Sequence, residues 1–222
     1  MKKYTFELLQ NYKKYSANEM LLQSHIFYEA IKTRRSVRDF SDKQVAEDVI
    51  INCIKAAGTA PSGANLQPWH FVIIKDSQIK KEIRIAAELE EKEFYNGRAP
   101  KEWLAALAPL GTNEHKQFLE TAPYLIAIFS KSFDVLEDGS QQKNYYAAES
   151  TGIACGFLIN ALHHSGLASL THTPSPMNFL NKILNRPNNE RPFLLLVTGY
   201  AADGVKVPVI KKKSIEDITT II

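Results

Sequence analysis

The sequence predicts a soluble globular domain that combines helices and strands. Three observations support this. The 222 residues are 45% hydrophobic, enough for a sizeable core in a chain of single-domain length. In several segments apolar residues recur at three- and four-residue spacing, which is typical of amphipathic helices. Elsewhere, short apolar runs bounded by Gly, Pro or polar residues indicate buried strands.

The clearest helix pattern lies in residues 46–57, where Val49, Ile50, Cys53 and Ile54 follow one stripe and Gly58 supplies the stop. Further helices are expected at 18–33, after a capping Ser77, at 144–164 and at 178–184. The last long helix is rich in small residues, so another subunit's backbone could pack closely against it.

The predicted strands are 70–75, 124–129, 167–170 and 193–197, and a polar loop is expected before residue 144. The tail, 201–222, carries Lys211 to Lys213 and ends in a β-prone run. We expect this end to pair with the sheet edge of a partner.

Composition excludes several classes of protein. A net charge of +3 is too balanced to predict a nucleic-acid partner or a polybasic membrane contact. The polar, basic N-terminus does not resemble a signal peptide, and no run has the roughly 18 apolar residues that a membrane span needs. Cys53 and Cys155 lie within helical segments and have no metal-ligand spacing. We therefore expect a cytoplasmic protein without a metal site.

The stretch from Pro61 to Trp69 is predicted to be a loop between a helix and a strand. Small residues at Ser62, Gly63 and Ala64 would let a ligand approach the main chain and its N–H groups. The alternative is an ordinary connection with a packed Trp69. The loop alone favours that alternative.

Three arginines fall within Arg34 to Arg38. In an extended conformation Arg34, Ser36 and Arg38 would share one side, which suits an anionic ligand. The alternative is a solvated basic turn. These residues, the loop at Ser62 and Lys211 to Lys213 would together suit a phosphate-bearing cofactor, although no dinucleotide fingerprint, P-loop or serine-nucleophile elbow is present.

Residues 88–117 form a polar insertion with interleaved aromatic side chains and several breakers, among them Asn96-Gly97 and Ala99-Pro100. Such an insertion in a compact domain is typical of a lid over a site. A solvated helical hairpin explains the same pattern equally well.

Two of these stretches resemble a known family. Arg34 to Arg38, followed by Pro61 to Ala64 and Gln67-Pro68-Trp69, resembles the FMN-binding signature of the nitroreductase superfamily. Within it the chain is most similar to the iodotyrosine deiodinases, which hold their amino acid substrate with a Glu, a Tyr and a Lys. Here these would be Glu91, Tyr95 and Lys116 in the insertion.

The resemblance implies a single α+β domain over 1–222 with a central mixed β-sheet flanked by helices. It also implies an intertwined homodimer with FMN at the subunit interface, a substrate lid at about 88–117, and a C-terminal extension, 201–222, exchanged with the partner. Animal members add a membrane anchor that this sequence lacks, so a soluble, bacterial-type member is expected. Electrons are expected from an NADP-linked source.

The resemblance also assigns the cofactor site. The FMN-binding residues would be Arg34, Arg35, Ser36, Val37, Arg38, Ser62, Thr171, His172, Thr173 and Lys212. Ser62 would come from the partner subunit, and the Thr173 hydroxyl would donate to flavin N5 and favour single-electron steps. The family often has arginine where this chain has Lys212, which keeps the charge but loses the bidentate fork. Asn65, Leu66 and Gln67 differ from animal deiodinases.

The activity implied is reductive dehalogenation of a halotyrosine, which releases halide and tyrosine. Glu91 would bind the substrate ammonium and Lys116 its carboxylate, with Tyr95 beside them. The Ala64 N–H would bind the phenolate. We expect the lid to order when the substrate binds. The alternatives are a general FMN-dependent nitroreductase or quinone reductase, and a non-catalytic flavin-binding protein.

Overall fold

The computed structural model describes residues 4–222, and the chain divides into two compact units whose boundary in the sequence lies between Arg34 and Arg35. The first unit contains one helix, α1 (Ala17–Lys32). A capping box begins it, because the Ser16 hydroxyl accepts from the Glu19 N–H at 3.4 Å and the Glu19 carboxylate accepts from the Ser16 N–H at 2.8 Å. No residue of α1 is buried, although the helix carries Ile26 and Phe27.

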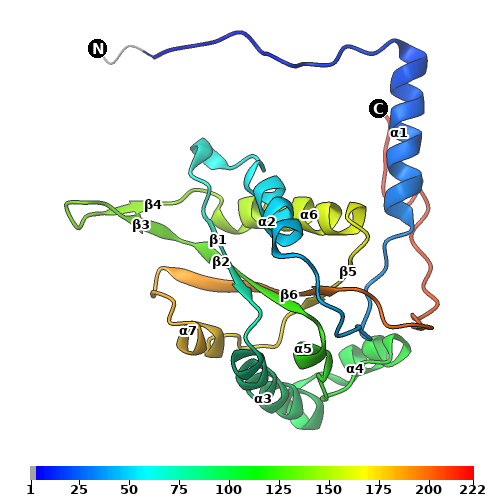
Figure 1. The fold of residues 1–222 in the computed structure, drawn as a ribbon, viewed down its shortest axis with the longest axis vertical. Coiled ribbons are helices and arrows are strands. Elements are labelled where there is room, and N and C mark those ends of the chain that lie inside the picture. Colours follow the sequence, from blue (N-terminus) through cyan, green and yellow to red (C-terminus); the bar gives the residue numbers. More distant parts are fainter. Residues whose placement is uncertain (1–3) are drawn as a thin grey trace. The chain divides into compact units, whose positions relative to one another are not determined.

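The second unit is organised around a four-stranded sheet in the order β1-β2-β6-β5 (Figure 1). The strands are β1 (Trp69–Ile74), β2 (Tyr124–Lys131), β6 (Glu190–Gly199) and β5 (Ala168–His172). All three pairings are antiparallel. Among the described residues, the parallel pairing is the isolated bridge between Ser36 and Ser169, so the mixed character expected of the sheet is confined to that bridge.

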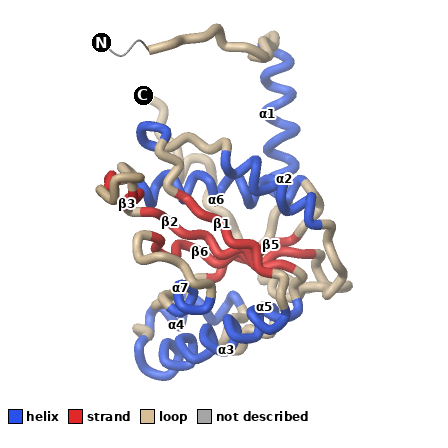
Figure 2. Tube along the Cα trace, turned by 60° about the vertical axis from the view of Figure 1, so that its left-hand side comes forward, coloured by secondary structure: helices blue, strands red, loops and turns tan. Residues whose placement is uncertain are grey.

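Helices cover both faces of the sheet (Figure 2). α2 (Glu47–Gly58) and α6 (Ala147–His164) lie on one face. On the other side lie α3 (Ser77–Glu93), α4 (Lys101–Leu107), α5 (Phe118–Thr121) and α7 (Phe179–Ile183). Shorter turns are η1 (Gly63–Asn65), the π-helical η2 (Phe94–Arg98) and η3 (Ala108–Leu110). The predicted helices and strands are thus confirmed, with small shifts at their ends.

The core divides into two layers because side chains alternate along each strand. On β6, Leu195 and Val197 pack into the layer of α3, α5 and α7, whereas Leu194 and Leu196 pack into the layer of α2 and α6. β2 is buried along nearly its whole length, which explains its continuous apolar run.

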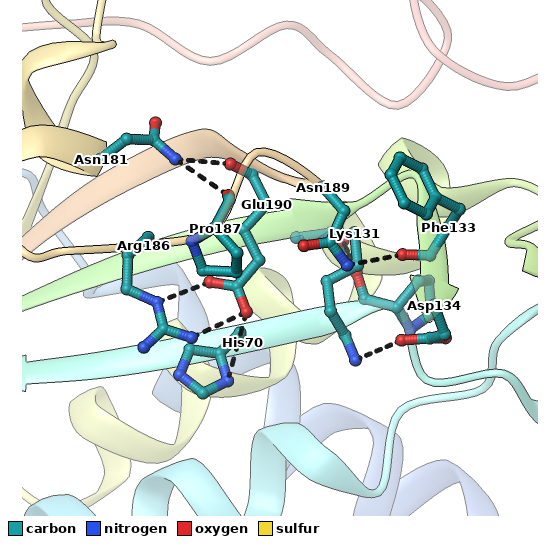
Figure 3. A network of polar contacts seen from close by, with 11 residues as sticks. His70, Lys131, Phe133, Asp134, Asn181, Arg186, Pro187, Asn189 and Glu190 are labelled. Carbon is teal, nitrogen blue, oxygen red and sulfur yellow. Dashed lines mark hydrogen bonds and ion pairs between the residues drawn. The ribbon is translucent and has the colours of Figure 1, made fainter. Parts of the chain in front are cut away.

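A polar network links β1, β2 and β6 at the end of the sheet where β6 begins (Figure 3). The Glu190 carboxylate is 5% exposed and accepts from Arg186 at 2.7 and 2.8 Å, with His70 Nδ1 3.9 Å away. On β2, the Lys131 ammonium pairs with Asp134 at 2.7 Å. The main-chain N–H of Lys131 donates to the carbonyl of Pro68. The network therefore anchors the strand that leaves the 61–69 loop.

Three local predictions were wrong. The polar loop expected before residue 144 contains the hairpin β3 (Phe133–Val135) and β4 (Gln141–Lys143). The side chain that caps α3 is Asp76, which accepts from the Ile79 N–H at 2.9 Å, and Ser77 is the first helical residue. α6 begins at Ala147, because Tyr146 has the left-handed backbone angle φ 50°.

Candidate functional site

A cavity of about 240 Å³ lies between the 88–117 insertion and the end of β5. It brings together residues that the sequence places far apart. Its walls include Arg38, Glu90, Glu91, Phe94, Tyr95, Trp103, Thr112, Lys116, Phe118, Thr171, His172, Thr173 and Ser175. All three predicted substrate residues of the insertion therefore face one space with the three residues Thr171 to Thr173.

Glu91 and Lys116 form a buried ion pair inside this cavity. Their charged atoms are 3.2 Å apart, and the side chains are only 13% and 3% exposed. The Lys116 ammonium also donates to the Thr112 hydroxyl at 3.3 Å and to the Asn113 carbonyl. Burial lowers the pKa of Lys116, and the Glu91 carboxylate opposes that shift. The site thus holds one anion and one cation side by side.

Tyr95 lies in η2, a wide helical turn closed by the Ala99 N–H, which donates to the Phe94 carbonyl at 2.9 Å. The Phe94 ring meets Tyr95 and Trp103 edge-on, with centroids 5.4 and 5.1 Å apart. The Lys116 ammonium is 5.7 Å from the Tyr95 ring centroid. Such π-helical turns are frequent at functional sites, and this one places an aromatic wall beside the ion pair.

The residues Thr171, His172 and Thr173 alternate in orientation, as expected at the end of a strand. His172 pairs with Leu195 and is buried, whereas Thr171 pairs with Leu196 and is exposed, as is Thr173. The His172 ring packs edge-on to Phe118, and its Nε2 atom is buried without a hydrogen-bond partner in the described part of the chain. Burial, with smaller contributions from Lys116 and Arg38, lowers the pKa of His172 to about 3. The imidazole is therefore neutral.

The arginine segment spans both units. Arg34 ends the first unit, and its N–H donates to the Ile31 carbonyl. In the second unit, Arg35 donates to the Pro208 carbonyl and Val37 is buried in the core. Arg38 reaches the cavity. Of this segment, Val37 can therefore offer a ligand only its main chain.

The 61–69 loop is built as a tight, partly left-handed turn, but Ser62 and Ala64 do not line the cavity within one chain. Ala64 has φ 51°, and we find no acceptor for its N–H among the described residues. The Ser62 hydroxyl accepts from the Gln67 N–H at 3.0 Å, so it already braces the loop. Lys212 lies further on, in an exposed tail.

The residues around the cavity suit a flavin. The exposed hydroxyls of Thr171 and Thr173 and the unsatisfied His172 Nε2 offer polar contacts to a heterocycle. Neither Arg35 nor Arg38 has an acidic partner among residues 4–222, so neither guanidinium charge is neutralised there, and Arg35 donates only to the neutral Pro208 carbonyl. In the same residues, no group of three or more His, Cys, Asp or Glu side chains could hold a metal ion.

Sequence reasoning missed several residues of this site. Glu90 and Ser175, which line the cavity, carried no motif signal, and Arg98, which bonds to both, was missed because Ser175 is 77 positions away. Phe94 and Trp103 were visible only as aromatic residues in a charged stretch. Thr112 stands four positions before Lys116 in the sequence, and this short separation was the available hint to its place in the site.

Comparisons with known proteins agree with this geometry. A sequence profile described as the Nitroreductase family matches residues 31–200. A protein of Haliscomenobacter hydrossis named iodotyrosine deiodinase is 57% identical over 199 residues, 90% of each chain. The human iodotyrosine deiodinase 1 is 42% identical over 92% of this chain and 71% of its own length.

Solved structures give the same result. An iodotyrosine deiodinase bound to FMN and 3-iodo-L-tyrosine aligns with a TM-score of 0.75 and 32% identity over 88% of this chain and 100% of that one. A BluB-like flavoprotein from Clostridium difficile aligns with a TM-score of 0.66 at 24% identity, which shows the shared fold alone. By its sequence and its fold, the chain belongs to the nitroreductase family and is similar within it to the iodotyrosine deiodinases.

Proposed function

We propose that the chain is an FMN-dependent reductive dehalogenase of halotyrosines, releasing halide and tyrosine. One observation carries the proposal: Glu91, Tyr95 and Lys116 meet in one cavity beside Thr171 to Thr173. A deiodinase at 57% identity and an FMN-bound deiodinase of the same fold support it.

The buried ion pair provides the substrate specificity. An amino acid carries an ammonium and a carboxylate, so on binding it can form one ion pair with Glu91 and another with Lys116. The net charge of the buried site then stays the same. Glu91 takes the ammonium and Lys116 takes the carboxylate, with the Tyr95 ring beside both groups. No charge is left unpaired in the buried site, and this avoids the main cost of moving ions out of water.

The cofactor would be held by the arginine segment, Ser62, Thr171 to Thr173 and Lys212. Bound FMN, once reduced, would supply the two electrons that, with one proton, replace the carbon–halogen bond by carbon–hydrogen and release halide, and the flavin would end in its oxidised form. The unpaired N–H of Ala64 binds the phenolate oxygen and orients the ring. The lid excludes water from the reacting atoms when it is closed.

The active form is inferred to be a homodimer. Large apolar side chains remain exposed on several elements, a pattern that marks an interaction surface. They include Met20, Leu21, Leu22, Ile26 and Phe27 of α1, Ile153 and Phe157 of α6, and Ile210, Ile215, Ile218 and Ile221 of the tail. A second copy would cover these surfaces and bring its own Ser62 and Ala64 to the cavity. The tail, 201–222, is the segment proposed to be exchanged.

A cytoplasmic location is part of the proposal. Cys53 and Cys155 are both free and buried, which suits a reducing compartment. Among the described residues, no helix is long and apolar enough to cross a membrane.

The direct test reduces the FMN-loaded protein with dithionite and measures iodide released from 3-iodotyrosine, with bromo- and chlorotyrosine as parallel substrates. Stoichiometric halide and tyrosine are expected. In the Thr173→Ala variant, dehalogenation should fall while reduction of a nitroaromatic compound is retained. Native protein that reduces nitroaromatics but releases no halide would support the general reductase instead.

A further inference from the structure

Arg98, the last residue of η2, links the insertion to the segment that follows β5. Its Nη2 atom donates to the Ser175 carbonyl at 2.6 Å and to the Glu90 carbonyl at 2.9 Å. The Glu90 carboxylate lies 3.1 Å from the same nitrogen. Nη2 has two hydrogens, so it can donate one hydrogen bond to each carbonyl, and the Glu90 carboxylate adds mainly electrostatic attraction.

The position of these partners makes the contact informative. Glu90 and Ser175 both line the cavity, and Arg98 approaches them from outside it. Glu90 precedes the substrate residue Glu91, and Ser175 follows Thr173 by two positions. One guanidinium therefore joins the lid, which carries Glu91 and Tyr95, to the loop that carries the proposed flavin contact.

We propose that Arg98 is a positioning residue that holds the lid closed over the amino acid end of the substrate. The inference rests on the proposed function. The side chain is 41% exposed, so its ion pairs with Glu90 and Glu93 contribute little. The bond to the Ser175 carbonyl is the contact that connects lid and loop. Lid opening must break it.

The planar guanidinium fork is needed for this contact. It can donate to two carbonyls in fixed directions, whereas a lysine ammonium has a different donor geometry and a flexible stem. Arg98→Lys should therefore resemble Arg98→Ala more than the native protein. Glu90→Gln should have a smaller effect, because the bond between Arg98 and Ser175 remains.

The experiment measures the Kd of 3-iodotyrosine for the FMN-loaded, oxidised protein by flavin fluorescence, without turnover. Arg98→Ala should raise Kd about tenfold, the loss expected for a charge-assisted hydrogen bond. Arg191→Ala is the matched control, an exposed arginine on β6 outside the site, and should leave Kd unchanged. Reduction of a nitroaromatic, which has no amino acid end, should be unchanged in Arg98→Ala and in Arg191→Ala.

A second measurement detects lid closure itself. Iodotyrosine should protect native Phe94, Tyr95 and Trp103 from chymotrypsin, and protection should weaken in Arg98→Ala. Native affinity and native protection in that variant would overturn the proposal, as would an equal loss of FMN binding and nitroaromatic reduction. Native protein that binds iodotyrosine without releasing iodide contradicts the proposed function only, because the comparison of Kd values still decides the role of Arg98.

Discussion

Under the proposed function, substrate recognition depends on the buried Glu91–Lys116 ion pair. Lys116→Met and Glu91→Gln should each raise the Kd of 3-iodotyrosine by about tenfold to a hundredfold, because each removes one charge-assisted contact worth roughly 1.5–3 kcal/mol. Isothermal titration of the FMN-loaded protein would measure this. Lys92→Met, at an exposed lysine next to Glu91, is the control and should bind normally. If both site variants keep native affinity, the lid does not hold the amino acid end.

His172 gives a prediction about stability. Its pKa is about 3 in the folded protein, well below the ordinary value near 6.5, because the ring is buried near Lys116 and Arg38. The unfolded chain therefore binds the proton first, and stability is lost as the pH falls below 6.5. Between pH 7 and pH 5 this group should cost about 2 kcal/mol of unfolding free energy.

Urea denaturation at pH 7 and at pH 5 would test this prediction about His172. His172→Phe keeps an aromatic ring against Phe118 and removes the titrating group. The difference in unfolding free energy between pH 7 and pH 5 should shrink by about 2 kcal/mol in this variant. The remaining carboxylate titrations are common to both proteins. An unchanged difference would show that His172 is accessible to protons in the folded state.

The 61–69 loop depends on its packing against the start of α6. A Cβ on Gly63 would lie 2.9 Å from the Tyr145 carbonyl oxygen and 3.2 Å from the Tyr146 ring. Because the first neighbour is main chain, Gly63→Ala must move the loop. The Gly63 N–H lies 3.4 Å from the Ser150 hydroxyl, and the Pro68 carbonyl accepts from Lys131 N–H, so both ends of the loop are fixed.

We therefore expect Gly63→Ala to displace the Ala64 N–H and to raise KM for 3-iodotyrosine by about tenfold or more. The preference for 3-iodotyrosine over 3-iodophenylalanine, which lacks the phenol oxygen, should shrink in the same variant. Gly58→Ala is the control, since nothing lies within 4 Å of that Cβ. An unchanged preference would mean that the loop N–H does not bind the phenolate.

Local patterns predicted the regular elements well, and long-range contacts explain what they missed. The stripe of Ile50 and Cys53 expresses burial of one helix face, and the continuous apolar run of β2 expresses burial on both faces of the sheet, so local patterns sufficed for both elements. In the β3–β4 hairpin, β4 is exposed and polar, and β3 is supported by Asn189, which donates to the Phe133 carbonyl at 2.8 Å from 56 positions away. No short stretch of sequence contains both partners of that hydrogen bond.

The candidate site was likewise predicted only in part, because its remaining features depend on contacts that the sequence does not show. The resemblance identified Glu91, Tyr95 and Lys116, but not that an ion pair already joins two of them. Arg98 was missed because its partner Ser175 is 77 residues away. The resemblance assigned Thr171, His172 and Thr173 to the flavin, but not that the His172 ring is buried edge-on to Phe118 while the two threonines are exposed. Side-chain direction decided each of these points.

At the scale of the whole molecule, the proposed roles of Ser62 and Ala64 require a second copy, because within one chain neither residue lines the cavity. α6 offers a surface on which a second copy can pack. Gly156 has nothing within 4 Å of its Cβ position, and Ile153 and Phe157 are 44% and 42% exposed. Small residues beside exposed apolar ones allow two such helices to approach closely.

Phe157→Glu places a charge on that surface and should convert a dimer into monomers, since burying an unpaired carboxylate is costly. Sedimentation equilibrium would measure the mass, and the ratio of FMN to protein after gel filtration would measure cofactor retention. The mass and the ratio of FMN to protein should fall together if the cofactor site spans two copies. Val135→Glu, at a 60% exposed position on β3, is the control and should remain dimeric and loaded with FMN. A monomeric Phe157→Glu protein that retains FMN and releases iodide at the native rate would show that one chain builds the complete site.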